Sequence, residues 1–382
     1  EAMDGLNLFG IRGGSSSVVH VLHDEVARSR TTLISLLPRE SNSKEVDAAL
    51  LSVIGFPAFA VEDEAIVERT RQKILDKLAG NYGCKRFLRD GHQTVLEDTT
   101  RLHYEPEELQ QFEHIECEWP LFFTYLVLDG LFRGDLAQAE TFRQKLQPLF
   151  VERHGWPLLP ELYYVPKDKI TAERLTPNSQ VRLPNENIPL IWAQSLYLLG
   201  ELIAEGFLAL GDVDPLGRHL RLGKAPEPTV QIALLAEDES LQQDLKTFGV
   251  ETQTLQQLEP IQVLDAKALA RAYHQLGQNS QLGLSGRPIR RLRSLTTACL
   301  YRFKGEFKAF LPAFLDQAQF YLTLDYHFLV DQIKTELAYI RRHWSHLGRP
   351  TVTLLLTKTM LTGGRKPLLQ LFQELNHGEC NG

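Results

Sequence analysis

The 382-residue sequence has few cysteines, no excess of positive charge and no apolar run of membrane length. Its four cysteines (Cys84, Cys117, Cys299 and Cys380) are too few and too scattered to hold a fold together by disulfides. No CxxC pair is present, which argues against a zinc ribbon. We therefore predict a reduced, cytoplasmic protein with no metal site and no cofactor.

Positive charge is outnumbered, with 41 Lys and Arg against 48 Asp and Glu and a net charge of −7. Proteins that bind nucleic acid or anionic membranes present a basic face, so we expect neither partner. The most apolar stretch, residues 189–210, is interrupted by Gln194, Glu201 and Glu205. It predicts a buried helix and no transmembrane segment.

Length and composition predict a globular chain of two domains, or three. Hydrophobic residues make up 43% and charged residues 23%, which is ordinary for globular proteins. The composition changes over residues 216–228, "LGRHLRLGKAPEP", which we interpret as a linker. We therefore expect one domain over 1–220 and a smaller one over 226–382.

The first part of the chain has apolar residues at helical spacing and few alternating stretches. Helices are predicted over 14–37, 40–55, 61–80, 118–134, 135–150 and 188–209. Long loops over 81–112 and 152–187 are rich in Pro, Tyr and Asp, and long ordered loops often carry function. Helical hairpins with such loops indicate a mainly α fold of toroid type.

The last part of the chain mixes two periodicities. Residues 229–238 and 350–357 alternate like strands, whereas 239–248, 265–276 and 326–346 have helical spacing. A smaller α/β domain is expected. The stretch 329–344 is a basic amphipathic helix, which is typical of calmodulin targets but equally of ordinary core packing.

The segment "GWPLLPELYY" (155–164) is the strongest candidate site. Glu161 follows a proline in an irregular stretch that also contains Trp156, Tyr163 and Tyr164. Carbohydrate sites combine aromatic faces for the sugar ring with a carboxylate for hydroxyls or for proton transfer. The alternative is a surface glutamate beside core aromatics.

A second acidic segment, "ECEWP" (116–120), places Glu116, Glu118 and Trp119 at the start of a helix. Acidic residues there interact favourably with the helix dipole. That structural explanation is sufficient for both glutamates.

Long blocks of the sequence resemble the α and β regulatory subunits of phosphorylase kinase. They include "SNSKEVDAALLSVIGFPAFAVED" (41–63), "YGCKRFLRDGHQT" (82–94), "PLLPELYYVP" (157–166) and "PLIWAQSLYLLGELIAEGFLALGDVDPLGR" (189–218). Further blocks lie at 104–132, 284–292, 310–326 and 348–356, so the resemblance covers nearly the whole chain. It implies a role in glycogen metabolism, with a kinase catalytic subunit and calmodulin as partners.

That family is similar in its N-terminal part to glycoside hydrolase family 15, the glucoamylases. The similarity implies an (α/α)6 six-hairpin toroid and inverting hydrolysis of α-1,4-glucans by an acid and a base set roughly 6.5–9.5 Å apart. The glucoamylase base lies in an "LPEQ"-like loop before a "W-[SA]-H-A" helix. Leu159-Pro160-Glu161-Leu162 and Trp192-Ala193-Gln194-Ser195 match these two motifs.

The match assigns Glu161 as the candidate general base. We further expect α-glucan or maltooligosaccharide to be bound by Glu118, Trp119, Trp156, Trp192 and Gln194, which lie in or near the matched segments. Leu162 replaces the family's Gln and Gln194 replaces its His, which predicts weaker positioning of the base or substrate.

The family's general acid lies upstream of the position that matches Glu1. We therefore expect a fragment cut at both ends, with the later half of the toroid, and inactive by itself. Cys380 is third from the end and forms no prenylation box, the family's means of peripheral membrane association. Three functions stay open: a glucan-binding regulatory subunit, an inverting glucan 1,4-α-glucosidase in its full-length form, and a scaffold without ligand binding.

Overall fold

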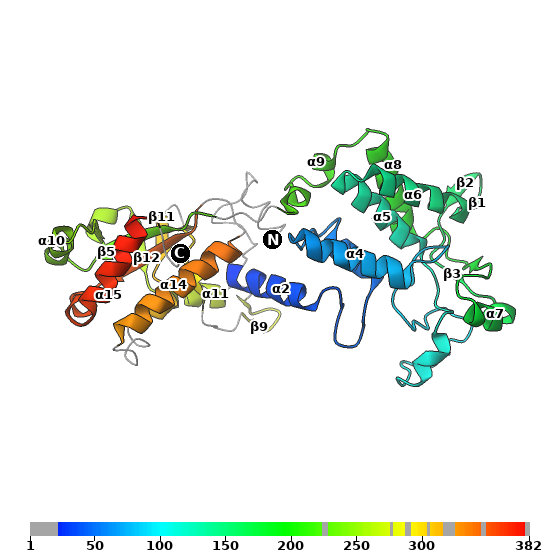
Figure 1. Cartoon of the computed structure of the whole chain (residues 1–382), viewed down its shortest axis with the longest axis horizontal. Coiled ribbons are helices and arrows are strands. Elements are labelled where there is room, and N and C mark those ends of the chain that lie inside the picture. The colour runs from blue at the N-terminus through cyan, green and yellow to red at the C-terminus, as the bar shows by residue number, and fades with distance from the viewer. Residues whose placement is uncertain are drawn as a thin grey trace. The chain divides into compact units, whose positions relative to one another are not determined.

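A computed structural model describes residues 22–223, 228–275, 278–286, 292–303, 306–315, 325–344 and 349–378. The chain forms two compact units, one of residues 30–225 and one of residues 1–29 with 226–382 (Figure 1). Helices predominate over strands, which confirms a mainly α protein. The predicted domain limits, 1–220 and 226–382, stay a prediction, because a compact unit is not by itself a segment that folds independently.

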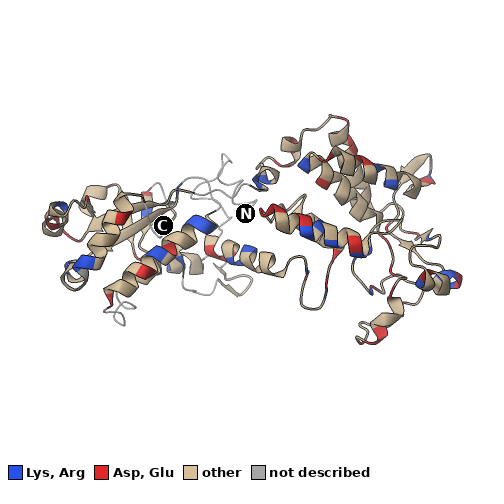
Figure 2. Ribbon diagram, viewed as in Figure 1, with Lys and Arg blue, Asp and Glu red and all other residues tan. Residues whose placement is uncertain are grey.

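The 30–225 unit is built mainly of helices. Its longer helices are α4 (Glu64–Leu78), α5 (Pro120–Arg133), α6 (Leu136–Leu146), α8 (Ile191–Ala204) and the part of α2 (His23–Leu36) from residue 30 onward. Its shorter helical segments are η1 (Ala48–Leu50), α3 (Leu51–Ile54), η2 (Glu108–Phe112), η3 (Gln147–Leu149), η4 (Lys167–Lys169), α7 (Ile170–Leu175), α9 (Leu210–Val213) and η5 (Arg218–Arg221). Charges of both signs lie along α4 (Figure 2), while its Val67, Ile74 and Leu78 are buried.

The predicted helical hairpin is confirmed as α5 and α6. Gly134 ends α5 in the left-handed conformation, with φ 74°, and Asp135 then caps α6 by accepting the Gln138 N–H at 2.9 Å. Every residue of α5 from Pro120 to Phe132 is buried. Gly130 permits close packing, because a Cβ there would lie 2.8 Å from the Ala139 nitrogen.

The prediction of one helix over residues 40–55 is wrong for most of that range. Residues 40–47 are irregular, and only η1 and α3 follow. The Ser41 hydroxyl accepts the Lys44 N–H at 3.2 Å, and the Asp47 carboxylate accepts the Ala49 N–H at 2.9 Å. Such short polar side chains compete with the helical hydrogen bonds of the backbone.

Short strands organise the long loop of the 30–225 unit. β1 (Val151–Arg153) pairs antiparallel with β2 (Trp156–Leu158), and β3 (Tyr163–Tyr164) pairs antiparallel with β4 (Leu183–Pro184). The second pair brings residues near 161 and 185 together across more than twenty positions of sequence.

The second unit contains two three-stranded sheets. In one, β5 (Gln231–Ala236) lies between β12 (Thr351–Leu356) and β6 (Gln253–Thr254), all parallel; in the other, β11 (Glu306–Phe310) lies between β10 (Tyr301–Phe303) and β7 (Ile261–Leu264). Among its described residues, the helical segments after residue 226 are α10 (Glu239–Thr247), η6 (Gln256–Leu258), α11 (Ala266–Gln275), α12 (Ser294–Thr297), η7 (Ala313–Leu315), α14 (Tyr326–His343) and α15 (Lys358–Asn376). The same unit contains a small hairpin of β8 (Gln278–Asn279) and β9 (Leu284–Ser285).

The predicted strands at 229–238 and 350–357 and the three predicted helices of this unit are confirmed. Helix α15 was missed, because Gly363, Gly364 and Pro367 interrupt its pattern. The apolar face of α14, with Leu329, Ile333, Leu337 and Ile340, is buried in the core of this unit. Of the two interpretations offered for residues 329–344, this burial corresponds to ordinary core packing and not to a calmodulin target.

No described helix is long and apolar enough to cross a membrane. Cys84 and Cys117 are buried free thiols, and Cys380 lies outside the described residues.

Candidate functional site

The "LPEL" loop lies directly against the start of α8. The Leu159 N–H donates to Gln194 Oε1 at 2.9 Å, and the Leu190 N–H donates to the Leu159 carbonyl at 2.9 Å. Leu159 and Leu162 are fully buried on either side of Pro160 and Glu161. The structure therefore brings together the two motifs that suggested a site.

Gln194 serves this loop through its side-chain amide. Its Oε1 accepts the Leu159 N–H, and its Nε2 lies 3.5 Å from the Pro157 carbonyl. A side-chain amide both accepts and donates. The glutamine that stands here in place of the family's histidine thus contacts the loop backbone at two positions.

The Glu161 carboxylate is held by two neutral amides. Oε2 accepts from Gln93 Nε2 at 3.0 Å and from Asn185 Nδ2 at 2.7 Å. The Glu161 N–H donates to the Asn187 carbonyl at 3.0 Å, which fixes the backbone as well. Oε1 makes no hydrogen bond to any described residue.

Glu161 lines an open pocket of about 640 Å³. The described residues around it are Gln93, Val95, Glu161, Tyr164, Pro184, Asn185, Glu186 and Asn187. Two carboxylates and three amides lie around this space, and no lysine or arginine is among the described residues that line it. The pocket can thus accept hydrogen bonds from hydroxyl groups and disfavours anions, and Tyr164 supplies an aromatic surface.

The three predicted tryptophans do not line this pocket. Trp119 is buried and its ring stacks on His92, with centroids 6.1 Å apart. Trp156 is 70% exposed on β2, and Trp192 is 55% exposed on α8, where its Nε1 donates to the Tyr125 hydroxyl at 3.1 Å. Their assignment to sugar binding stays a prediction that this pocket does not support.

Glu118 lies outside the pocket as well. It is fully buried, its Oε1 is 2.9 Å from the Arg182 guanidinium, and its Oε2 accepts the Tyr82 N–H at 2.7 Å. Burial raises the pKa of Glu118, while Arg182 and the Tyr82 N–H act to lower it. Gly80 must lack a side chain, because a Cβ there would lie 2.2 Å from this carboxylate.

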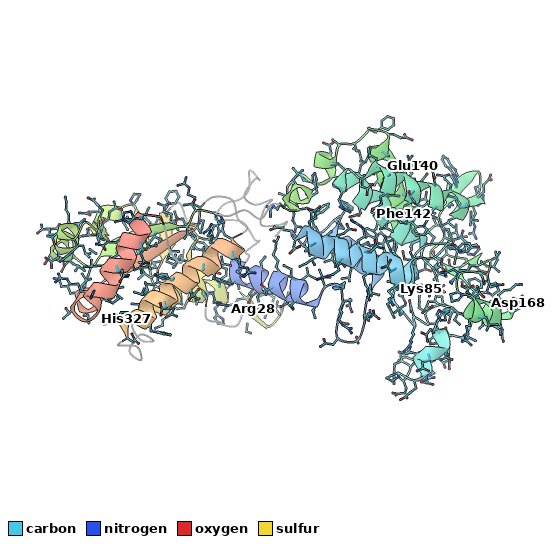
Figure 3. All side chains as sticks on the ribbon, in the orientation of Figure 1. Arg28, Lys85, Glu140, Phe142, Asp168 and His327 are labelled. Carbon is cyan, nitrogen blue, oxygen red and sulfur yellow. The ribbon has the colours of Figure 1, made fainter. Side chains whose placement is uncertain are left out.

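Neighbouring acids share this arrangement. Glu173, also fully buried, lies 3.0 Å from Arg182, and Glu116 lies 2.9 Å from Lys85. Lys85 comes just after the C-terminal end of α4 (Figure 3). These buried pairs connect the 80–90 segment, the start of α5 and the 173–182 segment, which is a structural role.

Gln93 and Asn185 were missed from the sequence. Gln93 lies 68 positions before Glu161, and nothing in its local pattern indicates a site. Asn185 reaches Glu161 only because β3 pairs with β4. Within the described residues no group of three or more His, Cys, Asp or Glu is placed to hold a metal ion.

Comparison with known proteins identifies the family. Residues 1–360 match the family model described as glycosyl hydrolases family 15. The phosphorylase b kinase regulatory subunit alpha, skeletal muscle isoform, of Oryctolagus cuniculus is 49% identical over 387 residues, which cover 100% of this chain and 31% of that protein.

Other relatives agree. The liver isoform of Mus musculus is 47% identical over 363 residues, which cover 95% of this chain and 29% of that protein. The probable phosphorylase b kinase regulatory subunit alpha of Drosophila melanogaster is 46% identical over 385 residues, with 100% and 31% covered. The chain thus spans about a third of the length of the curated relatives it matches. By its match over residues 1–360, the chain belongs to glycosyl hydrolases family 15.

Proposed function

We propose that the chain acts within a regulatory subunit of phosphorylase kinase and so controls glycogen breakdown in the cytoplasm. Identities of 46–49% along the whole chain to proteins named as that subunit support this role. A kinase catalytic subunit is its proposed partner. Calmodulin is a second, and it must bind elsewhere than the apolar face of α14 unless that helix leaves the core.

The proposed ligand of the pocket is an α-glucan or maltooligosaccharide. The single observation that carries this is the Glu161 carboxylate, which two neutral amides hold at an open pocket whose described lining contains no lysine or arginine. Sugar hydroxyls donate well to a carboxylate oxygen, and Tyr164 offers a face for the ring. The α5–α6 hairpin and α8 are proposed to belong to the later half of an (α/α)6 toroid.

Calorimetric titration with maltoheptaose tests the glucan site. Wild-type protein should bind, and Glu161→Gln should bind at least tenfold more weakly, because the side chain that meets the sugar hydroxyls loses its negative charge. Glu152→Gln is the matched control, since it removes the same charge from exposed β1. No binding by the wild type, or equal binding by both variants, would overturn the glucan-site proposal.

Inverting hydrolysis is the second candidate, and the match to glycosyl hydrolases family 15 favours it. Such an enzyme needs an acid opposite Glu161. Glu186 is the one other carboxylate among the described residues that line the pocket. Glucose release from maltoheptaose that Glu161→Gln abolishes would make the protein a hydrolase; binding without release would support the regulatory role.

A further inference from the structure

Gln93 has an unusual backbone conformation for a residue with a side chain. Its φ is 56°, in the left-handed region that L-residues rarely adopt. Such outliers persist where the surrounding structure enforces them, and they gather at functional sites. The backbone outlier at Gln93 therefore calls for a reason.

Hydrogen bonds enforce the turn that contains Gln93. The Gln93 N–H donates to Glu97 Oε2 at 2.7 Å, and the His92 N–H donates to Asp90 Oδ1 at 3.1 Å. Arg86 in turn holds the Asp90 carboxylate with two bonds, at 2.6 and 2.8 Å. The turn is thus built so that residue 93 stays in this conformation.

The result of the turn is a closed triangle of side chains at the pocket. Gln93 Nε2 and Asn185 Nδ2 both donate to Glu161 Oε2, and Asn185 Nδ2 also lies 2.9 Å from Gln93 Oε1. Oε2 therefore accepts two hydrogen bonds from these amides, which occupy its two lone pairs. All three residues line the pocket.

We propose that Gln93 and Asn185 are positioning residues, which clamp Glu161 through Oε2 so that Oε1 stays available to a ligand hydroxyl. Because both amides are neutral, the clamp fixes the carboxylate without neutralising its charge. An arginine in the same place would do both, as Arg182 does for Glu118. This proposal rests on the proposed glucan-binding role of the pocket.

Replacing Gln93 by glycine separates positioning from structure. Glycine adopts positive φ freely, so Gln93→Gly should leave the thermal unfolding midpoint unchanged or raised. Maltoheptaose affinity should nevertheless fall at least fivefold, because the clamp is gone. A merely structural residue would show the opposite pattern, with a lower midpoint and unchanged affinity.

Arg89→Gly is the matched control for that variant. Arg89 also has a positive φ, 61°, in the same loop, and its N–H donates to Glu116 Oε1 at 2.8 Å. Its side chain lies outside the pocket, so the affinity should stay within twofold of wild type. Asn185→Asp, which keeps the shape but puts a second carboxylate against Oε2, should weaken binding at least tenfold.

A readout without ligand separates the clamp from the glucan site. In amide NMR spectra of the protein, Glu161→Ala should move the side-chain NH2 resonances of Gln93 and Asn185, and Glu152→Ala should not. Unmoved resonances would overturn the clamp whether or not the wild type binds maltoheptaose. Moved resonances in a wild type that binds no sugar would retain the clamp and reject the glucan proposal.

Normal affinity in both Gln93→Gly and Asn185→Asp, together with lost affinity in Glu161→Gln, would reject the positioning role alone. Lost affinity in all three, with a preserved unfolding midpoint, is the result that the clamp predicts.

Discussion

Two glutamates of the 30–225 unit lie on paired segments yet have opposite surroundings. Glu118 and Tyr163 exchange backbone hydrogen bonds of 2.9 and 2.8 Å, and Glu161 precedes Tyr163 by two residues. Glu118 is fully buried against Arg182, whereas Glu161 is half-buried against two neutral amides and borders an open pocket.

The two carboxylates differ in the charge of the groups that hold them. A guanidinium compensates the charge of Glu118 where no ligand can reach it, so the pair holds segments together. Neutral amides fix the geometry of Glu161 and leave its charge uncompensated. The first arrangement serves the fold, and the second can serve a ligand.

The largest expected effect comes from removing the cation of the buried pair. Arg182→Met leaves Glu118 and Glu173 buried without their partner, which should cost about 3–5 kcal/mol of unfolding free energy. Urea unfolding followed by circular dichroism measures it. The triple variant with both glutamates changed to Gln should recover part of the loss, and a loss below about 1 kcal/mol would contradict the structural role.

Glu161→Gln should have the opposite profile. Its side chain borders solvent and its amide neighbours can rotate to pair with an amide, so the unfolding free energy should change by less than about 1 kcal/mol. Maltoheptaose affinity should fall at least tenfold in the same preparation, as measured by calorimetry. A large loss of stability would place Glu161 in the same structural class as Glu118.

Local signals in the sequence predicted much of the fold. Gly134 and Asp135 end one helix and start the next, and α5 is apolar along most of its length. The "LPEL" motif identified the loop of Glu161. These features depend on neighbours within a few positions, which sequence patterns contain.

The rest of the site depends on pairing between distant segments. Asn185 reaches Glu161 through the register of β4 on β3, and Gln93 arrives from a turn more than sixty positions away. The tryptophans were assigned by nearness in sequence, which does not tell that Trp119 is buried or that Trp156 points into solvent. Residue type alone cannot distinguish those cases.

Aromatic residues should show an intermediate effect. Tyr164→Ala should weaken maltoheptaose binding by about 0.5–1.5 kcal/mol, or roughly two- to thirteenfold, because Tyr164 lines the pocket. Trp156→Ala should leave the affinity unchanged, since that ring lies on β2 outside it. Calorimetric titration of both variants under the same conditions measures the two losses of affinity. A larger loss in Trp156→Ala than in Tyr164→Ala would place the binding surface on the β1–β2 hairpin.

The smallest effect is expected from a glutamate that is ion-paired like Glu118 but exposed. The hydrogen bond from Arg101 lowers the pKa of Glu108 to about 2, from an ordinary value near 4.5. The folded-state pKa is depressed, so the stabilisation is complete above the unfolded pKa and is lost as pH falls from about 4.5 through about 2.

Wild-type protein should therefore lose slightly more thermal stability than Glu108→Gln over this pH window at low salt. In 1 M NaCl the difference should vanish, because exposed pairs are screened. A difference that persists in high salt would mean that the charge partner, and not burial, decides how much a carboxylate contributes to stability.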